Sequence, residues 1–364
     1  MRDVKKKPDV RLIDLFCGCG GLTAGVKTAI AAHSRKLKVA LAVDFEARAM
    51  RVYRSNFGSI ADYVDCNDIA NYVAIERASA PLARNERAVM ERLGGADLLV
   101  AGPPCQGHSN LNNSSRRSDP RNLHYWAPVR FAMGLRPKVV LVENVPGVTL
   151  AQEQVIEGAR SAFERLGYRV SDCTVELVKL GVPQLRKRHV LLATLAPGFD
   201  VAELIAAKSH ETRLTVMDAI GDLVNEAQDG GRPFVRTTKL SVNNRQRIDY
   251  LFDNRAYDLP DPLRPACHRD KVHSYVSMYG RMHPDRPAQT ITSGFGSMGQ
   301  GRFVHPTRRR MITAHEAARI QGFADDFSFE EAPDVTSLRE MIGNAAPPAL
   351  ASVLVGEIMA RGGL

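Results

Sequence analysis

The chain's most telling segment is Val10-Arg11-Leu12-Ile13-Asp14-Leu15-Phe16, an apolar run that passes directly into Cys17-Gly18-Cys19-Gly20-Gly21. This order predicts a strand over residues 10–16, a glycine turn and a helix over residues 22–32. Glycines at such a turn allow a ligand to approach the backbone closely. The full Gly-x-Gly-x-x-Gly spacing fails at Thr23, which favours an adenosine-bearing ligand other than a dinucleotide. A tight turn that binds nothing is the alternative.

The alternation of apolar strands and helical patterns continues along the first third of the chain. We expect a helix over residues 46–55 and further strands over residues 37–43, 62–64, 96–101 and 138–142. Such alternation is typical of a parallel sheet with helices on both faces. The expected fold class is therefore α/β, with a Rossmann-like doubly wound sheet.

Composition sets the outer bounds on what the chain does. Its 364 residues suffice for one large domain with a smaller one appended. The 49 Lys and Arg against 40 Asp and Glu give a net charge of +9, which favours a polyanionic partner over a membrane. Six cysteines without an apolar leader segment indicate a reducing compartment rather than a disulfide framework. We expect a soluble intracellular protein.

Acidic residues follow the second and third predicted strands. Asp44 supplies a carboxylate suited to ribose hydroxyls, and Phe45 offers a ring to an adenine. Asp68 is placed to accept a hydrogen bond from an adenine amino group, although an exposed loop aspartate has the same appearance. Together with the glycine turn, these residues favour a nucleoside cofactor.

Cys105 follows the strand over residues 96–101, within Gly102-Pro103-Pro104-Cys105-Gln106. Loops at the carboxyl edge of a parallel sheet are where α/β folds place their sites. Carbon 5 of cytosine is a poor nucleophile until a thiolate adds to carbon 6, whereas methylation of an exocyclic amine favours an aromatic residue at this position. A cysteine after Pro-Pro therefore indicates carbon methylation.

Three further residues complete the predicted catalytic set. Glu143 ends the strand over residues 138–142 and is placed to act at ring nitrogen 3. Arg186 and Arg188 precede a strand over residues 189–194, and alternation directs both guanidinium groups to one side, where they could hold the base carbonyl. A solvated glutamate and a generic basic strand end are the alternatives.

These residues resemble the DNA (cytosine-5) methyltransferase family in six collinear blocks. The blocks are Asp14-Leu15-Phe16-Cys17-Gly18 through Gly21, Gly102-Pro103-Pro104-Cys105-Gln106, Glu143-Asn144-Val145, Gln184-x-Arg186-x-Arg188, Arg286-Pro287-Ala288-Gln289-Thr290-Ile291-Thr292 and Gly343-Asn344-Ala345-Ala346-Pro347-Pro348. The resemblance implies a methyltransferase sheet, S-adenosyl-L-methionine as cofactor, duplex DNA as substrate, base flipping, and a covalent adduct between Cys105 and carbon 6. It also implies cofactor contacts at Phe16, Gly18, Gly20, Gly21, Asp44, Phe45, Asp68, Ile69, Pro104 and Asn344.

The resemblance also organises the rest of the chain. We expect a catalytic domain over residues 1–196, completed by 336–364, and a smaller irregular domain over 197–335 with target recognition at about 230–285. The expected DNA contacts are Gln106, Ser109, Arg116, Arg117, Arg121, Arg245 and Arg269. Residues 293–302 have the composition of a flexible glycine-rich loop, and Arg308-Arg309-Arg310 either follows a phosphate backbone or forms a surface charge run. We expect a monomer, no membrane association, and a cognate restriction endonuclease as a further partner.

Several alternatives stay open. His108 stands where the family usually has Phe, which puts the detail of loop closure in doubt, and a protease-like pair of Cys105 with His108 is a weak alternative. Cys267, His268 and His273 lack the second pair of thiolates that a structural zinc site needs, so we expect no metal. An RNA-directed methyltransferase and an inactive DNA-binding module are the rival functions. The insert between the arginine and framework blocks favours duplex DNA.

Overall fold

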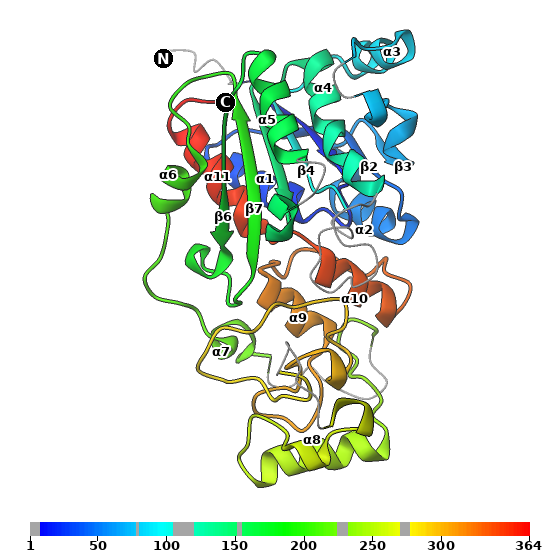
Figure 1. Ribbon diagram of the computed structural model, residues 1–364, viewed down its shortest axis with the longest axis vertical. Helices are drawn as coiled ribbons and strands as arrows, with labels where there is room; N and C mark the ends of the chain where they lie inside the picture. Colours follow the sequence, from blue (N-terminus) through cyan, green and yellow to red (C-terminus); the bar gives the residue numbers. More distant parts are fainter. Residues whose placement is uncertain (1–7, 78–79, 105–119, 151–154, 224–231, 270–276) are drawn as a thin grey trace, which may run out of the picture. The chain divides into compact units, whose positions relative to one another are not determined.

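The computed structural model describes residues 8–77, 80–104, 120–150, 155–223, 232–269 and 277–364 (Figure 1). The chain divides into two compact units. The first comprises Met1–Glu176, Lys187–Ser209 and Ala346–Leu364, and the second comprises Leu177–Arg186 and His210–Ala345. Compared with the domains expected from the sequence, residues 177–186 and 336–345 belong to the second unit and residues 197–209 to the first.

The first unit contains a seven-stranded sheet in the order β3-β2-β1-β4-β5-β7-β6. Its strands are β1 (Val10–Leu15), β2 (Leu37–Asp44), β3 (Val64–Cys66), β4 (Leu98–Ala101), β5 (Val139–Asn144), β6 (Arg169–Glu176) and β7 (Lys187–Thr194). The first five strands are parallel, and β7 is antiparallel to both β5 and β6. The expected Rossmann-like α/β sheet is confirmed, with β6 as a strand that the sequence did not indicate.

Helices cover both faces of this sheet, which is why β1, β2, β4 and β5 are apolar almost throughout. The helices are α1 (Gly21–Ala32), α2 (Ala47–Phe57), α3 (Arg84–Leu93), α4 (Ala127–Leu135), α5 (Val155–Arg165), α6 (Val201–Ala206) and α11 (Pro348–Ala360). One core cluster joins alternate strand residues to α4 and α5, while α1 lies against β1 and β2 on the opposite face, beside α11 (Figure 1).

The end of the chain packs back onto its beginning through α11. Gly25 of α1 permits this contact, because a Cβ there would lie 2.0 Å from the carbonyl oxygen of Pro348. The window Val335–Ala360 is apolar enough by composition to cross a membrane, but it is half buried. It also breaks into α10 (Val335–Asn344) and α11. We therefore interpret α11 as a core helix.

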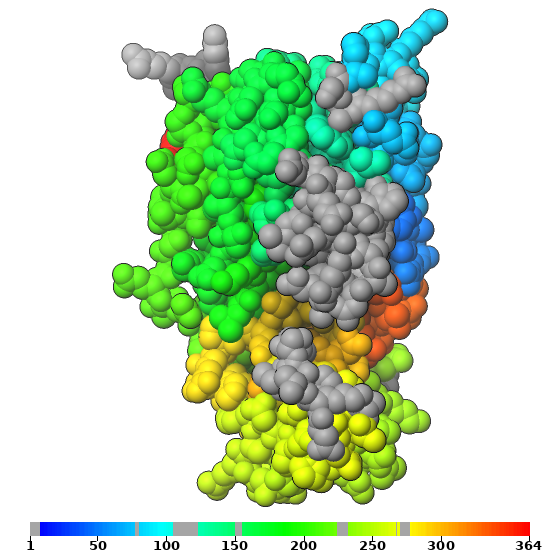
Figure 2. All heavy atoms as spheres, in the orientation of Figure 1, coloured from blue at the N-terminus to red at the C-terminus, as the bar shows by residue number. Residues whose placement is uncertain are grey.

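The second unit is largely irregular in the described residues, as expected for the smaller domain. Besides α10 it contains α7 (Val216–Ile220), α8 (Val242–Asp253) and α9 (Ala314–Gln321). Thr313 caps α9 in a capping box: its hydroxyl accepts the N–H of Glu316, whose carboxylate accepts the N–H of Thr313. Helix α8 lies at the surface of this unit (Figure 2), and Val242 at its start is 74% exposed.

Candidate active site

Asp44 organises the glycine turn that follows β1. Its carboxylate lies at the end of β2, where Oδ2 accepts the N–H of Gly18 at 2.9 Å and Oδ1 accepts the N–H of Glu46 at 2.9 Å. Burial raises the pKa of Asp44, and the backbone donors at Glu46 and Gly18 oppose that effect. The carboxylate therefore joins the turn to the end of the neighbouring strand, and each oxygen retains a lone pair for a further donor.

Gly18 and Gly20 are glycines for different reasons. Both have positive φ, 52° and 99° respectively. A Cβ at Gly18 would meet no heavy atom of the described residues within 4 Å, so the turn is open there. A Cβ at Gly20 would lie 2.4 Å from Cε2 of Phe57, so this glycine accommodates the packing of α2. Of the two, Gly18 has the open surroundings that a ligand needs. Gly21 is the buried first residue of α1.

Asp14 is buried beneath this turn. Its Oδ2 accepts a hydrogen bond of 2.6 Å from the Thr23 hydroxyl, which also lies 2.9 Å from the Tyr53 hydroxyl. Asp14 Oδ1 is buried and has no hydrogen-bond partner among the described residues. Burial raises the pKa of Asp14 to about 7, and Asp44 contributes in the same direction. Asp14 is therefore a carboxyl group that titrates near neutral pH.

The two cysteines of the turn are unreactive in this setting. Cys17 and Cys19 are both buried free thiols. Burial raises the pKa of Cys17 well above its ordinary value and that of Cys19 to about 12. Because the thiolate is the nucleophile, neither is suited to covalent chemistry near neutral pH.

Aromatic and acidic side chains border the open turn. Phe16 packs edge-on against His124, with ring centroids 5.6 Å apart, and His124 is a neighbour that no sequence signal identified. Phe45 is 70% exposed. Asp68 is also exposed and accepts the N–H of Ala70 at 2.9 Å, while the side chain of Ile69 is packed in the core.

Glu143 and Arg188 form a close ion pair at the same edge of the sheet. Glu143 lies opposite Val190 in the antiparallel pairing of β5 with β7, so Arg188, two residues before Val190, projects from the same face. Arg188 Nε lies 2.5 Å from Glu143 Oε1, and the two side chains are 12% and 10% exposed. Because β7 is antiparallel, it begins where the parallel strands end, which brings its first residues to this edge.

The segment before Cys105 lies beside this ion pair. A Cβ at Gly102 would be 3.6 Å from Glu143 Oε2 and 3.8 Å from the carbonyl oxygen of Phe16. Asn144 Nδ2 donates to the carbonyl oxygen of Pro103 at 3.3 Å. The segment from Gly102 to Pro104 therefore lies between the glycine turn and the Glu143–Arg188 pair. Cys105 itself lies outside the described residues.

Arg186 corrects one expectation. Its guanidinium is buried in the second unit and donates to the carbonyl oxygens of Ile291 at 2.8 Å and of Gly343 and Ala345 at 3.1 Å each. Strand β7 begins at Lys187, so the alternation that was expected to align Arg186 with Arg188 does not extend to residue 186. Arg186 therefore joins the framework and closing blocks.

Other predicted residues are only partly described. Gln106, Ser109, Arg116 and Arg117 lie outside the described residues, as does the side chain of Arg121. Arg245 and Arg269 donate to the carbonyl oxygens of Arg309 and Arg264 at the surface. Asn344 is exposed at the end of α10. No group of three metal-binding side chains occurs in the described part of the chain, and His273 lies outside it.

The basic run Arg308-Arg309-Arg310 is engaged within the second unit. Arg310 forms a bidentate pair with buried Glu316 at 2.7 Å, and Arg309 contacts the carboxylates of Asp249 and Asp253. Arg308 donates to the carbonyl oxygen of Leu223. These contacts favour the interpretation of Arg308-Arg309-Arg310 as a surface charge run over its interpretation as a segment that follows the phosphate backbone.

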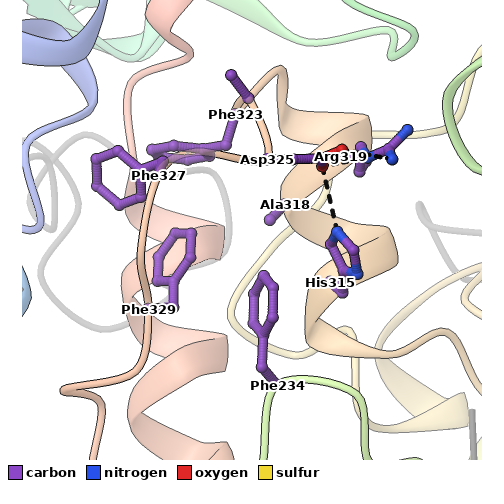
Figure 3. Close-up of a pocket in the computed structure, with 9 residues that line it drawn as sticks. Phe234, His315, Ala318, Arg319, Phe323, Asp325, Phe327 and Phe329 are labelled. Carbon is purple, nitrogen blue, oxygen red and sulfur yellow. Dashed lines mark hydrogen bonds and ion pairs between the residues drawn. The ribbon is translucent and has the colours of Figure 1, made fainter. Parts of the chain in front are cut away.

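An aromatic pocket of the second unit has no catalytic character (Figure 3). Phe234 stacks between His315 and Phe329, with centroids 4.8 and 5.3 Å away. His315 lies 3.3 Å from Asp325, whose carboxylate also pairs with Arg319. Four of its nine lining residues are phenylalanine. We interpret the pocket as the local core that fixes the segment around Phe234.

Comparison with known proteins agrees with this arrangement. The family described as C-5 cytosine-specific DNA methylase matches residues 10–360. Type II methyltransferase M1.BsuMI of Bacillus subtilis (strain 168) is 40% identical over 345 residues, covering 95% of this chain and 79% of that protein. Type II methylase M.HgiDII of Herpetosiphon aurantiacus is 30% identical over 358 residues, covering 95% and 94% of the two chains.

Solved structures share the fold. A DNA modification methyltransferase encoded within an E. coli prophage has a TM-score of 0.65 at 22% identity, covering 97% of this chain and 99% of that one. The S. pombe Dnmt2 methyltransferase has a TM-score of 0.65 at 16% identity, with the same coverage. Sequence and fold thus agree over nearly the whole chain, which belongs to the C-5 cytosine-specific DNA methylase family and is a DNA (cytosine-5) methyltransferase.

Proposed function

We propose that the chain methylates carbon 5 of cytosine in a specific duplex DNA sequence, using S-adenosyl-L-methionine and a covalent adduct of Cys105. The observation that carries the proposal is the Glu143–Arg188 pair beside Gly102, which directly follows β4 and precedes Cys105 by three residues. This contact places Glu143 and Arg188 beside the segment that leads to Cys105.

The residues around the glycine turn fit an adenosine-bearing cofactor. The space above Gly18 is open, the Asp44 carboxylate has lone pairs for ribose hydroxyls, and the exposed Phe45 ring offers a stacking surface. We assign Asp68 to the adenine, and we retain Phe16, Pro104 and Asn344 as predicted contacts. When bound, S-adenosylmethionine supplies an electrophilic methyl group.

The chain's own residues account for the activation of cytosine. The Cys105 thiolate adds to carbon 6, and electron density moves toward ring nitrogen 3, which makes carbon 5 nucleophilic. Glu143 in its protonated form donates to nitrogen 3, and Arg188 donates to the carbonyl oxygen of the Glu143 carboxyl group and to the adjacent base carbonyl. After carbon 5 is methylated, its proton passes to water, the electrons of that bond restore the carbon 5–carbon 6 double bond, and the sulfur–carbon bond breaks, which releases the Cys105 thiolate.

The biological setting follows from the relatives. M1.BsuMI and M.HgiDII carry type II names, so we propose that this chain modifies one target sequence alongside a cognate restriction endonuclease. We assign target reading to the second unit, with Arg245 and Arg269 as predicted contacts. We propose that the protein acts as a monomer in the cytoplasm, associated with the nucleoid.

Covalent trapping tests this proposal. A duplex with 5-fluorocytosine at the target position cannot lose a proton from carbon 5, so the adduct should persist through denaturation. We expect trapping by the wild-type protein and by Arg186→Lys if that variant folds, and no trapping by Cys105→Ser. Release of intact wild-type protein from a confirmed target would contradict the covalent step.

A further inference from the structure

Arg339 on α10 is a half-buried guanidinium without a carboxylate partner. Burial is the single influence on its pKa, which it lowers. Within the described residues its one hydrogen bond runs from Nη2 to the Thr238 hydroxyl at 2.7 Å, and its buried Nε has no partner. Within the described residues, no carboxylate therefore compensates the positive charge of Arg339.

Two other arginines with little exposure in the described residues have the carboxylate partners that burial of a charge requires. Arg130 is paired with the Glu86 carboxylate, and Arg310 with that of Glu316. Arg186 donates to three carbonyl oxygens. In the described residues Arg339 has one hydroxyl in place of these groups, so its guanidinium has donors left for an external anion.

The guanidinium of Arg339 is held in a fixed position by the glycine-rich loop. A Cβ at Gly296 would lie 2.0 Å from Cζ of Arg339, so the guanidinium lies against the bare backbone of that residue. The Thr238 hydroxyl accepts from Arg339 and donates to the carbonyl oxygen of Gly296 at 3.1 Å. The loop, which the sequence predicted to be flexible, therefore positions the arginine before any ligand binds.

One edge of this guanidinium faces solvent. Nη1 makes no hydrogen bond within the described residues, yet it is not among the buried atoms that lack a partner, so it is accessible. Lys239, next to Thr238, and Ser297, next to Gly296, are both exposed. A guanidinium with a free N–H edge is a typical donor to phosphate oxygens.

We propose that Arg339, held by Gly296 and Thr238, binds a phosphodiester of the DNA backbone. The proposal rests on the chain's function as a DNA methyltransferase and adds a phosphate contact from α10, outside the region that the sequence assigned to target recognition. The phosphate supplies the anion that the protein lacks at this position. Because the contact is with the backbone, it fixes the position of the duplex and does not read its sequence.

Salt dependence of DNA binding tests this assignment. Each neutralised phosphate adds about 0.9 to the slope of log affinity against log salt. We measure the binding of Arg339→Gln to a fluorescein-labelled duplex and expect its slope of log affinity against log salt to be shallower than that of the wild type by about 0.9. The ratio of wild-type to variant affinity should therefore fall about 3.5-fold between about 50 and 200 mM salt. Arg339→Lys retains the charge and should keep the wild-type slope.

Arg309→Gln is the matched control, since the charge of Arg309 is already neutralised by Asp249 and Asp253. Thermal melting establishes that each variant is folded. A wild-type slope for Arg339→Gln, or an equal change for Arg309→Gln, overturns the phosphate contact while leaving methylation by the wild-type protein intact. Absence of DNA binding and methylation by the wild-type protein itself contradicts both this inference and the proposed function.

Discussion

Removing one partner of the Glu143–Arg188 pair should destabilise the first unit far more than removing both. Arg188→Met leaves the Glu143 carboxylate 10% exposed beside an uncharged side chain, where it had a partner at 2.5 Å. Breaking a buried pair in this way costs about 3–5 kcal/mol, whereas replacing both charges is often close to neutral. We expect a loss of about 3 kcal/mol for Arg188→Met, and a coupling of about 1–3 kcal/mol when it is combined with Glu143→Gln.

Urea unfolding followed by tryptophan fluorescence measures this cycle. The chain has one tryptophan, Trp126, which lies in the first unit against Gly158, so the signal reports on the unit that contains the ion pair. Lys187→Met is the matched control. Lys187 pairs with Glu176 at 58% and 34% exposure, and its loss should cost less than about 1 kcal/mol. If the effects of Glu143→Gln and Arg188→Met add to within about 0.5 kcal/mol, the two residues are not coupled and the reasoning is refuted.

Three further predictions concern the residues around the site. Because burial raises the pKa of Asp14 to about 7 from 3.8, the folded protein retains a proton that the unfolded chain loses near pH 4. The unfolding free energy should therefore fall by up to about 4 kcal/mol as pH rises from about 4 to 7, and Asp14→Asn should flatten that part of the urea-unfolding profile. Gly20→Ala introduces a contact of 2.4 Å with Phe57 at a φ of 99° and should lower the melting temperature. Gly18→Ala has no such contact in the described residues and should cost less stability. Calorimetry should show that Gly18→Ala binds the cofactor more weakly than the wild type. Arg186→Met removes a donor from the carbonyl oxygens of Ile291, Gly343 and Ala345, of which Ala345 keeps the Gln321 side chain as a donor, and should make the second unit sensitive to limited proteolysis, with unchanged protease resistance as the contrary result.

Local signals made the first half of the sheet predictable. Apolar runs that end in glycine, aspartate or proline located β1, β2, β4 and β5, because both faces of these strands are buried. Strand β6 gave no such signal, since it is an edge strand whose residues are mostly half-buried and polar. A pattern rule based on continuous apolar residues cannot detect it.

The position of a site residue was predictable where that residue lies at the end of a strand. It was less predictable where contacts with distant segments of the chain determine the position of the side chain. Glu143 and Arg188 meet because they lie near the edge at which β5 ends and β7 begins. Arg186, two residues before Arg188, is instead fixed by carbonyl groups more than a hundred residues later in the chain. In the sequence, the glycines after residue 293 suggest a flexible loop. In the structure, the guanidinium of Arg339 fills the space that a side chain at Gly296 would need.

The most direct test of the central claim is base-resolution methylation sequencing of DNA from cells that express the chain, beside cells that express Cys105→Ser. We predict 5-methylcytosine at one sequence motif on duplex DNA with the wild-type chain, and none above background with the variant. The contrary result is unmethylated DNA from wild-type cells, together with transfer of label from S-adenosylmethionine to purified tRNA.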